Sequence, residues 1–126
     1  MKRITGILIV FFLSLAASCS KAYEENYDSL FRTDAEGRQV PRMFTSYDLT
    51  SATGKLPVTV YYSGNWNLHF AEESSWAYLD RTEGKGVITI HVVYLQNDSG
   101  LGRSLTLKLE CDNGESLDIG INQVSI

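Results

Sequence analysis

The sequence predicts an all-β fold, because two features recur along the chain from Met43 to its end. Apolar and polar residues alternate with a period of two, which is typical of strands that bury one face. Clusters of glycine, asparagine and aspartate interrupt the alternation about every 8–12 residues, and no stretch keeps an apolar stripe at helical spacing. Short alternating strands between frequent turns indicate an immunoglobulin-like antiparallel β-sandwich of about seven strands.

The first two strand segments each have one apolar side. In residues 57–63, Val58, Val60 and Tyr62 fall on the same side of the strand. In residues 66–70, a tryptophan, a leucine and a phenylalanine alternate with polar residues. Because side chains of a strand point alternately to its two faces, these apolar sides are predicted to face the core.

Three further strand segments are residues 86–95, 104–111 and 116–126. The first is apolar on both sides over much of its length, as expected of a central strand. The other two alternate leucine or isoleucine with polar residues. The Asn113-Gly114 pair between them predicts a tight hairpin, because glycine readily adopts a positive φ.

The amino-terminal residues have the pattern of a secretion signal. Lys2 and Arg3 precede an apolar run that ends in small residues before Cys19. This run is shorter than the roughly 20 apolar residues that a membrane span needs. A cysteine directly after the small residues indicates a lipoprotein signal, so residues 1–18 are predicted to be removed and Cys19 to be lipidated. A soluble secreted protein with a chance cysteine at this position is the alternative.

The segment after the lipidated cysteine is predicted to be a tether. Residues 20–42 are rich in charged side chains and keep no periodicity of strands or helices. Such a composition is typical of a solvated linker. The sequence therefore predicts a lipidated cysteine and flexible tether over residues 19–42 and one domain over residues 43–126.

Charge and cysteine content exclude several classes of partner. Without Lys2 and Arg3, the 11 basic side chains fall to 9 against 15 acidic ones, a formal charge of −6. Nucleic-acid binding needs clustered basic residues and is not expected. Membrane attachment is expected through acyl chains instead of charge. With Cys19 acylated, Cys111 has no disulfide partner, so the domain must fold on its hydrophobic core.

The sequence gives little support for catalysis. His69 and His91 lie on different predicted strands, with no acid or cysteine at metal-ligand spacing. No nucleophile elbow, phosphate loop or zinc-protease pattern occurs. We therefore expect no enzymatic activity, no cofactor and no metal site, and we expect Cys111 to pack as a small apolar residue.

Aromatic side chains are the candidates for a binding function. A sugar ring can stack its apolar face on an exposed aromatic ring, while planar polar groups bind its hydroxyls. The candidate residues for carbohydrate binding are Tyr61, Trp76, Tyr94 and Trp66. Both tryptophans are also expected in the core, because a domain of this size needs the large area that a tryptophan buries. This holds most strongly for Trp66, which shares a strand face with Leu68.

Tyr61 is the candidate for which exposure is best supported. It lies on the strand side opposite Val58, Val60 and Tyr62, the predicted core side. Alternation does not decide whether Tyr94 is exposed, because its strand is apolar on both sides. The aromatic residues thus leave two interpretations open, a sugar platform or a packed interior.

Several motifs occur in an order that resembles a known family. They are YYSGNW, SSWAYL, EGKG, VITIHVVYLQN, GRSLTLKL and IGINQ. Together they are similar to the BACON domain, a Bacteroidetes-associated carbohydrate-binding domain that is often N-terminal. The resemblance covers roughly residues 40–126. The positions that carry it are Trp66, Trp76, Gly84, Gly86, Asn97, Arg103 and Gln123.

The resemblance implies an immunoglobulin-like fold in an envelope protein with an affinity for polysaccharide or mucin glycans. The acidic pair Glu24-Glu25 resembles the signal by which Bacteroidetes export lipoproteins to the outer face of the outer membrane. We therefore expect the lipid to anchor the protein in the outer membrane, with the domain at the cell surface and not on the periplasmic side. Some members of the family resemble spacers, so a structural or protein-interaction module of an envelope complex, without glycan affinity, is the alternative prediction.

Overall fold

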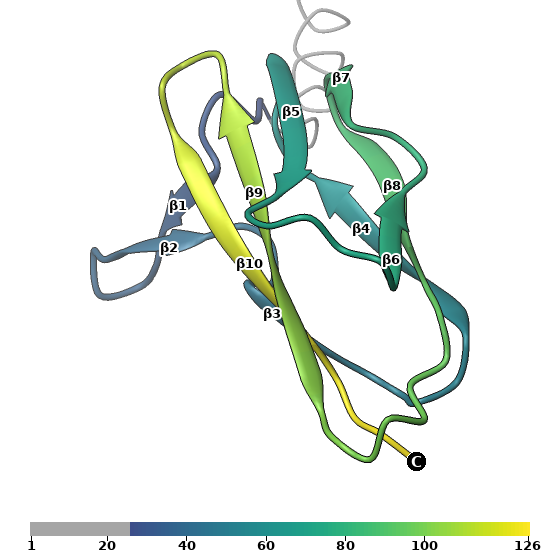
Figure 1. Cartoon of the computed structure of the whole chain (residues 1–126). Coiled ribbons are helices and arrows are strands. Elements are labelled where there is room, and N and C mark those ends of the chain that lie inside the picture. Colours follow the sequence, from purple (N-terminus) through teal and green to yellow (C-terminus); the bar gives the residue numbers. More distant parts are fainter. Residues whose placement is uncertain (1–25) are drawn as a thin grey trace, which may run out of the picture.

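The computed structural model describes residues 26–126, which contain ten β-strands (Figure 1). The strands are β1 (Phe31–Thr33), β2 (Gln39–Pro41), β3 (Ser46–Leu49), β4 (Gly54–Val60), β5 (Asn65–Phe70), β6 (Ala77–Leu79), β7 (Glu83–Lys85), β8 (Ile88–Tyr94), β9 (Arg103–Cys111) and β10 (Ser116–Gln123). The predicted signal peptide, Cys19 and the start of the predicted tether lie outside the described residues.

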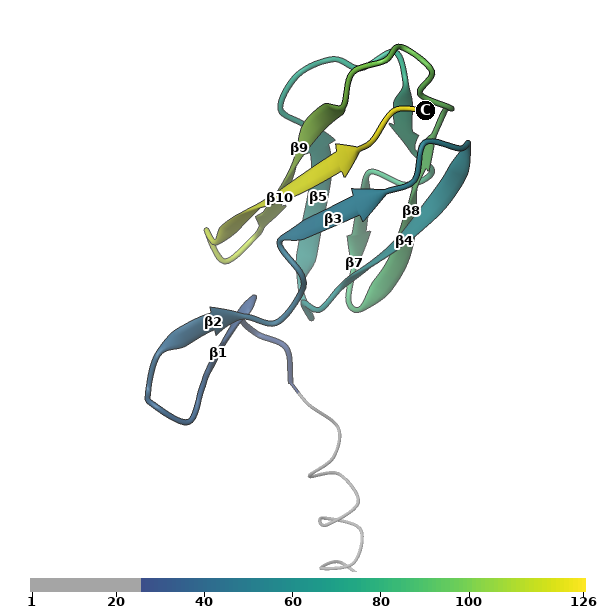
Figure 2. The same cartoon turned by 90° about the horizontal axis from the view of Figure 1, so that it is seen from below.

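Eight of these strands form two sheets. One sheet has the order β3-β10-β9-β5-β7 and the other the order β4-β8-β6. The two sheets face each other across the core, and β1 and β2 form a separate hairpin that projects from them (Figure 2). The all-β sandwich predicted from the sequence is confirmed.

The sandwich differs from the prediction in two details. The pairing of β3 with β10 is parallel, with Tyr47 opposite Ile121, whereas the other pairs are antiparallel. The sheets also contain more strands than the predicted seven. β6 and β7 have three residues each, which is too short for an alternating pattern to be recognised.

The predicted core faces are confirmed. Val58, Val60 and Tyr62 are buried, as are Trp66 and Leu68 on the next strand. The inner faces of β8, β9 and β10 supply the remaining core side chains: Ile90, Val92, Leu107, Leu109, Ile119 and Ile121. Each buried aliphatic side chain stabilises the fold by roughly 1.5–3 kcal/mol relative to an exposed one.

The hairpin between β9 and β10 forms where the Asn-Gly pair predicts it. Gly114 has a φ of 92°, and its N–H donates to the carbonyl of Cys111 at 3.0 Å. The Asn113 side chain accepts from the N–H of Glu115 at 2.9 Å. A tight turn followed by a left-handed glycine is a common way to close a short antiparallel loop.

The folded region begins before Met43, in the segment predicted to be a tether. Leu30 is fully buried in the core, and its N–H donates to a carboxylate oxygen of Glu115 at 2.8 Å. Ser29 donates to the other oxygen at 2.7 Å. Burial acts to raise the pKa of Glu115, but the hydrogen bonds from Leu30, the Asn113 side chain and Ser29 together outweigh it, and the pKa is lowered. The tether prediction is therefore wrong for residues 27–42, because one apolar residue and one distant carboxylate hold this charged segment on the sandwich.

Candidate functional site

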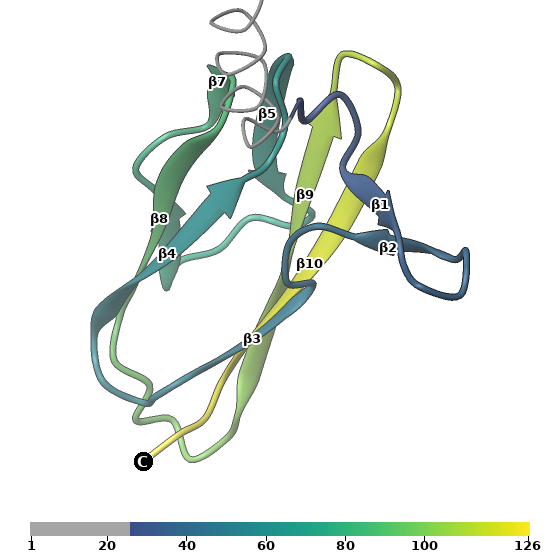
Figure 3. The same cartoon turned by 180° about the vertical axis from the view of Figure 1, so that it is seen from behind.

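A pocket of about 470 Å³ opens at the edge of the sandwich where β3 of one sheet faces β4 of the other. Figure 3 shows these two strands on the same side of the molecule, with the β1–β2 hairpin beside them. The lining residues are Tyr27, Arg32, Arg42, Met43, Phe44, Tyr47, Pro57, Thr59 and Tyr61. More than half of them belong to residues 27–44, so the amino-terminal segment and the sandwich edge build the pocket together.

Aromatic rings dominate the pocket. The rings of Tyr27 and Tyr61 have centroids 5.5 Å apart at an interplanar angle of 54°. Those of Phe44 and Tyr47 lie 6.0 Å apart, nearly perpendicular at 75°. The Phe44 side chain is 76% exposed, although a ring of this size is usually covered. Exposed apolar faces next to phenol hydroxyls are the features by which proteins bind ligands with both an apolar and a polar side.

Tyr61 and Tyr62 follow the end of β4 and have different surroundings. Tyr62 is buried, and its hydroxyl donates to the carboxylate of Asp112, an exposed residue. That hydrogen bond raises the pKa of Tyr62 to about 12 and lowers the pKa of Asp112. Tyr61, the residue before Tyr62, is half-buried and lines the pocket. The N–H of Ser63 donates to the carbonyl of Tyr27 at 2.6 Å, which places the Tyr27 ring beside Tyr61.

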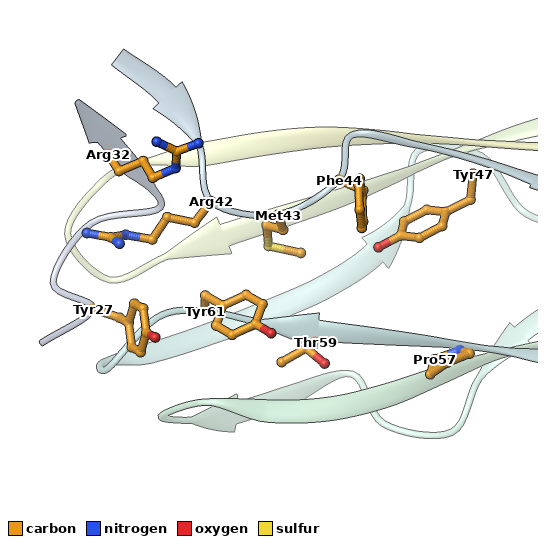
Figure 4. Close-up of a pocket in the computed structure, with 9 residues that line it drawn as sticks. All are labelled: Tyr27, Arg32, Arg42, Met43, Phe44, Tyr47, Pro57, Thr59 and Tyr61. Carbon is orange, nitrogen blue, oxygen red and sulfur yellow. The ribbon is translucent and has the colours of Figure 1, made fainter. Parts of the chain in front are cut away.

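The pocket has a cationic end. In Figure 4 the guanidinium groups of Arg32 and Arg42 lie at the end near Tyr27, and Tyr47 and Pro57 lie at the opposite end. The Arg42 guanidinium is 5.1 Å from the centroid of the Tyr27 ring, and its Nε donates to the carbonyl of Ser29 at 3.1 Å. Stacking on an aromatic ring and a hydrogen bond to the backbone hold this arginine in one orientation.

Of the four candidates predicted from the sequence, only Tyr61 lines the pocket. Trp66 is 3% exposed and its Nε1 donates to the carbonyl of Gly86 at 2.8 Å. Its ring lies so close to Gly84 that a Cβ there would be 2.6 Å from Trp66 Cζ2. Trp66 is therefore a core residue, as one of the two interpretations predicted, and is no longer a candidate for stacking on a sugar.

Tyr94 is also removed from the candidates. It is 9% exposed, and its ring packs over the backbone of Gly54, where a Cβ would lie 2.5 Å from the hydroxyl oxygen. The strand β8 is covered on this side by the facing sheet, so the ring has no face open to a ligand. Tyr94 shares the inner face of β8 with the fully buried Ile90 and Val92.

Trp76 is half-buried and lies outside the pocket. The Arg103 guanidinium is 4.4 Å from the centroid of its ring, a cation–π contact. Arg103 in turn donates from Nε to the side-chain oxygen of Gln123 at 2.8 Å. The ring thus contributes to a packed network, which makes Trp76 a weaker candidate than Tyr61.

Two buried amides complete this framework. Gln123 donates from Nε2 to the carbonyls of Thr50 at 3.1 Å and Leu95 at 2.8 Å. Asn97 donates to the carbonyls of Leu101 at 2.9 Å and Val124 at 3.3 Å, and the second bond joins the β8–β9 loop to the end of the chain. Buried polar groups need such partners, because an unpaired one costs free energy. Trp66, Gly84 and Gly86, three other positions that carry the family resemblance, pack together at the opposite end of β9.

The described residues contain no group of three or more histidine, cysteine or acidic side chains that could hold a metal ion. His91 Nδ1 lies 2.9 Å from Asp80 Oδ2, at the surface. Burial raises the pKa of the Cys111 thiol to about 12, so it is not a nucleophile at neutral pH. Between residues 26 and 126, no helix is long and apolar enough to cross a membrane.

Sequence reasoning missed most of the pocket. Tyr27 and Arg32 fall in the segment predicted to be a tether, and Phe44 and Tyr47 precede the first strand that alternation could identify. A signal was available, since a tyrosine and a phenylalanine in a charged segment are unusual for a solvated linker. The spatial meeting of these residues with Tyr61 depends on how β3 and β4 face each other, which periodicity does not specify.

Comparisons with known proteins show the fold alone. No protein-family model and no curated protein matches the chain. A solved structure of a Bacteroides ovatus GH5 xyloglucanase in complex with a XXXG heptasaccharide is similar, with a TM-score of 0.60 and 14% identity, over 76% of this chain and 19% of that chain. An NMR structure of a protein from Bacteroides thetaiotaomicron is similar with a TM-score of 0.52 and 13% identity, over 81% of this chain and 92% of that chain.

Proposed function

We propose that this chain is a non-enzymatic carbohydrate-binding module that a lipid on Cys19 holds at the outer membrane, facing the cell exterior. The observation that supports binding most directly is the aromatic pocket around Tyr61. Its volume of about 470 Å³ lies in the range of small-molecule sites, roughly 300–1,000 Å³. The resemblance to BACON domains and the fold shared with part of a xyloglucanase chain support a carbohydrate as the ligand.

The pocket supplies the two kinds of contact that a sugar needs. The faces of Tyr61, Tyr47 and Phe44 offer apolar surface to the C–H side of a pyranose. Tyrosine hydroxyls and the arginine guanidinium groups offer hydrogen-bonding partners to its hydroxyl groups. Tyr61 is central to this proposal, because it is half-buried, lines the pocket and lies on the side of its segment that alternation predicts to face away from the core.

The alternative function is a structural or protein-interaction module of an envelope complex. A second surface of the domain favours it. Four apolar side chains are exposed near the carboxyl end of the chain: Leu95, Leu101, Val124 and Ile126. Asn97 ties them together, because its side chain donates to the carbonyls of Leu101 and Val124 and its own carbonyl accepts from the N–H of Ile126. Ordered apolar surface of this kind is typical of a site that another protein covers.

Affinity gel electrophoresis tests the proposed function. Residues 19–126 carrying Cys19→Ser are run through gels containing xyloglucan, polygalacturonate or mucin. We expect at least one polysaccharide to retard the protein, and Tyr61→Ala to abolish the retardation. Tyr78→Ala is the matched control, because Tyr78 is 59% exposed but lies on β6, away from the pocket. Mobility that no host or plant polysaccharide changes would favour the interaction module.

The location is tested separately. If the domain lies on the cell surface, protease added to intact cells removes it, while a periplasmic protein of the same cells stays intact. Protection of the domain until the outer membrane is permeabilised would contradict the proposed orientation and, with it, the capture of external polysaccharide.

A further inference from the structure

We propose that one neutral sugar unit binds between Tyr47 and Tyr61, and that the hydroxyl groups of these two tyrosines select it. This inference rests on the proposed function, because it names the class of sugar that the pocket binds and the residues that recognise it. The two tyrosines belong to opposite walls of the pocket. Tyr47 lies on β3 of one sheet, whereas Tyr61 directly follows β4 of the other.

The two hydroxyl groups face the same space. In Figure 4 the rings of Tyr47 and Tyr61 extend from opposite walls, and their hydroxyl ends point toward one another across the pocket. The pKa of Tyr47 is raised, first by burial and then by the negative charge that Tyr61 carries when it is deprotonated. An interaction between charges weakens with distance, so the second cause agrees with two phenol groups that lie near each other.

Both hydroxyl groups can bind a ligand. Among residues 26–126, which the structure describes, neither hydroxyl has a hydrogen-bond partner. In the same part of the chain, every fully buried side-chain nitrogen or oxygen does have one, so the oxygens of Tyr47 and Tyr61 are not fully buried. The neighbouring Thr59 differs, because its hydroxyl lies 2.8 Å from that of Thr89. The polar groups left for a ligand in the middle of the pocket are therefore the two phenol hydroxyls.

A second aromatic ring holds each of the two tyrosines. The ring of Tyr47 packs edge-on against Phe44, with centroids 6.0 Å apart, and the ring of Tyr61 packs against Tyr27 at 5.5 Å. Such contacts restrict the orientation of a ring. Groups that are ordered before binding lose less conformational entropy when a ligand arrives, so the hydroxyls are in place to recognise one arrangement of sugar hydroxyls.

The hydrogen-bonding chemistry of a phenol favours a neutral sugar. A tyrosine hydroxyl can donate and accept, and so can each hydroxyl of a sugar, whereas a carboxylate only accepts. A sugar ring also carries hydroxyls on more than one edge. One ring held between the two walls can therefore contact Tyr47 on one side and Tyr61 on the other.

The arginines at the cationic end interact with groups of the chain. The Arg42 guanidinium stacks on the Tyr27 ring at 5.1 Å from its centroid. The pKa of Asp34 in the β1–β2 hairpin is lowered, first because the N–H of Arg38 donates to it and in part because of the positive charge of Arg32. An acidic ligand would compete with these interactions, whereas a neutral ligand leaves them in place.

A proline-rich peptide is the other ligand that aromatic-lined grooves bind. Its carbonyl groups only accept hydrogen bonds, and its proline residues have no N–H. Such a peptide would use the two hydroxyls as donors only. A sugar uses both their donor and their acceptor capacity, so the two facing hydroxyls favour the sugar.

Affinity gels with neutral and acidic polysaccharides test the neutrality of the ligand. Residues 19–126 carrying Cys19→Ser are run through gels containing xyloglucan, galactomannan or laminarin, which are neutral, or polygalacturonate, which is acidic. We expect at least one neutral polysaccharide to retard the protein more strongly than polygalacturonate does. We also expect added salt to leave this retardation unchanged, because ions screen interactions between charges and the ligand has none.

Tyrosine-to-phenylalanine variants assign the recognition to the two hydroxyls. Tyr47→Phe and Tyr61→Phe each keep the ring and remove one oxygen. Each should weaken binding about three- to tenfold, as expected for one lost hydrogen bond, measured from the mobility at increasing polysaccharide concentration. Tyr78→Phe on β6 is the matched control and should bind like the unmodified chain. Urea unfolding should be the same for all these proteins, because no hydrogen bond within the described residues is lost.

The double variant tests whether both hydroxyls bind the same sugar unit. If they do, the loss in Tyr47→Phe/Tyr61→Phe should be smaller than the product of the two single losses. The reason is that a ring released by one tyrosine is held less firmly by the other, so the two contacts are coupled. Losses that multiply fully would mean that the two hydroxyls contact separate units, which contradicts the inference.

Three further results would overturn the inference, and they differ in what they say about the proposed function. Retardation that both phenylalanine variants keep and Tyr61→Ala abolishes would leave the carbohydrate function and reject the role of the hydroxyls. Retardation by polygalacturonate or mucin, without any by a neutral polysaccharide, would make the ligand a charged glycan. Mobility that no polysaccharide changes would contradict the proposed function as well, and binding of polyproline that Tyr47→Phe weakens would then indicate a protein partner.

Discussion

Tyr61 and Trp66 are close in sequence and meet opposite environments in the fold. Trp66 is enclosed by Gly84 and by its hydrogen bond to Gly86, whereas Tyr61 lies at an open edge beside Tyr27. Trp66 and Gly84 lie on β5 and β7 of the same sheet, whereas the pocket at Tyr61 lies between β3 and β4 of two different sheets. In this domain, the tryptophan that lies against glycines is a core residue. The aromatic residues that line the pocket lie at the edge of the sandwich, between β3 and β4.

The two regions should therefore respond differently to mutation. Changes at the buried residues Trp66 and Gln123 should act on folding. Changes in the pocket should act on binding and leave the sandwich nearly intact. The following experiments test this division, in order of decreasing expected effect.

Trp66→Ala should give the largest loss of stability. Removing a buried aromatic side chain costs about 3–5 kcal/mol, from lost apolar burial and the cavity that remains. The loss would be measured as a decrease in the free energy of unfolding in urea. Any loss of ligand binding should follow the unfolded fraction. A decrease below about 1 kcal/mol would contradict the assignment of Trp66 to the core.

Gln123→Leu should have the next largest effect. The substitution keeps a similar volume but removes the partner of the Thr50 carbonyl and of the Arg103 Nε, and one of the two donors to the Leu95 carbonyl. Unpaired buried groups should lower the free energy of unfolding by about 1–3 kcal/mol. Asn122→Leu, at the exposed neighbouring position of β10, is the control and should change stability by less than about 0.5 kcal/mol.

Glu115→Gln tests the contact between the amino-terminal segment and the sandwich through its pH dependence. The pKa of Glu115 is lowered in the folded state from its ordinary value of 4.5. The unfolded chain therefore takes up this proton at a higher pH than the folded chain does. The stability that Glu115 contributes is present above pH 4.5 and is lost as the pH falls through the lowered pKa.

The measurement is Tm between pH 7 and pH 3. The unmodified chain should lose more stability over the acid part of this range than Glu115→Gln, because the variant has no carboxylate to protonate there. Glu73→Gln, at an exposed position, is the control and should follow the unmodified chain. Identical pH profiles for all three proteins would show that the contact to Leu30 does not hold the segment.

Tyr61→Ala should have the smallest effect on stability and, under the proposed function, a large effect on binding. The lost contact with Tyr27 is an aromatic pair worth about 0.5–1.5 kcal/mol. Urea unfolding measures this cost, and a loss of several kcal/mol would mean that Tyr61 belongs to the core. In that case, failure of the variant to bind a glycan would be no argument for a site at the pocket.

Much of the sandwich could be predicted from the sequence because its physics is local. The alternation of Val58, Val60 and Tyr62 assigns a buried face without knowledge of any partner strand, and Gly114 marks its turn by its own backbone preference. The inward position of Trp66 follows in the same way from its strand. Short strands such as β6 and β7 contain too few residues for such a pattern.

The candidate site could be predicted only in part because it is built from distant segments. Alternation predicts that Tyr61 faces away from the core, but it says nothing about Tyr27 or Tyr47 arriving next to it. The attachment of residues 27–42 to the sandwich involves Glu115, which lies 85 positions after Leu30 in the sequence. A contact of this kind has no local signature, and the charged composition of the segment pointed to a linker.

The contact between Leu30 and Glu115 also bears on how the domain would carry mechanical load. A pull from the amino-terminal side of the described residues reaches Tyr27 first and meets its main resistance at Leu30 and Glu115. Tyr27 and Arg42 line the pocket. Tension that detached residues 27–42 would therefore open the pocket while the two sheets stayed packed together. Under the proposed lipid anchoring, the affinity for a ligand would thus decrease as the force between the cell and the bound ligand increases.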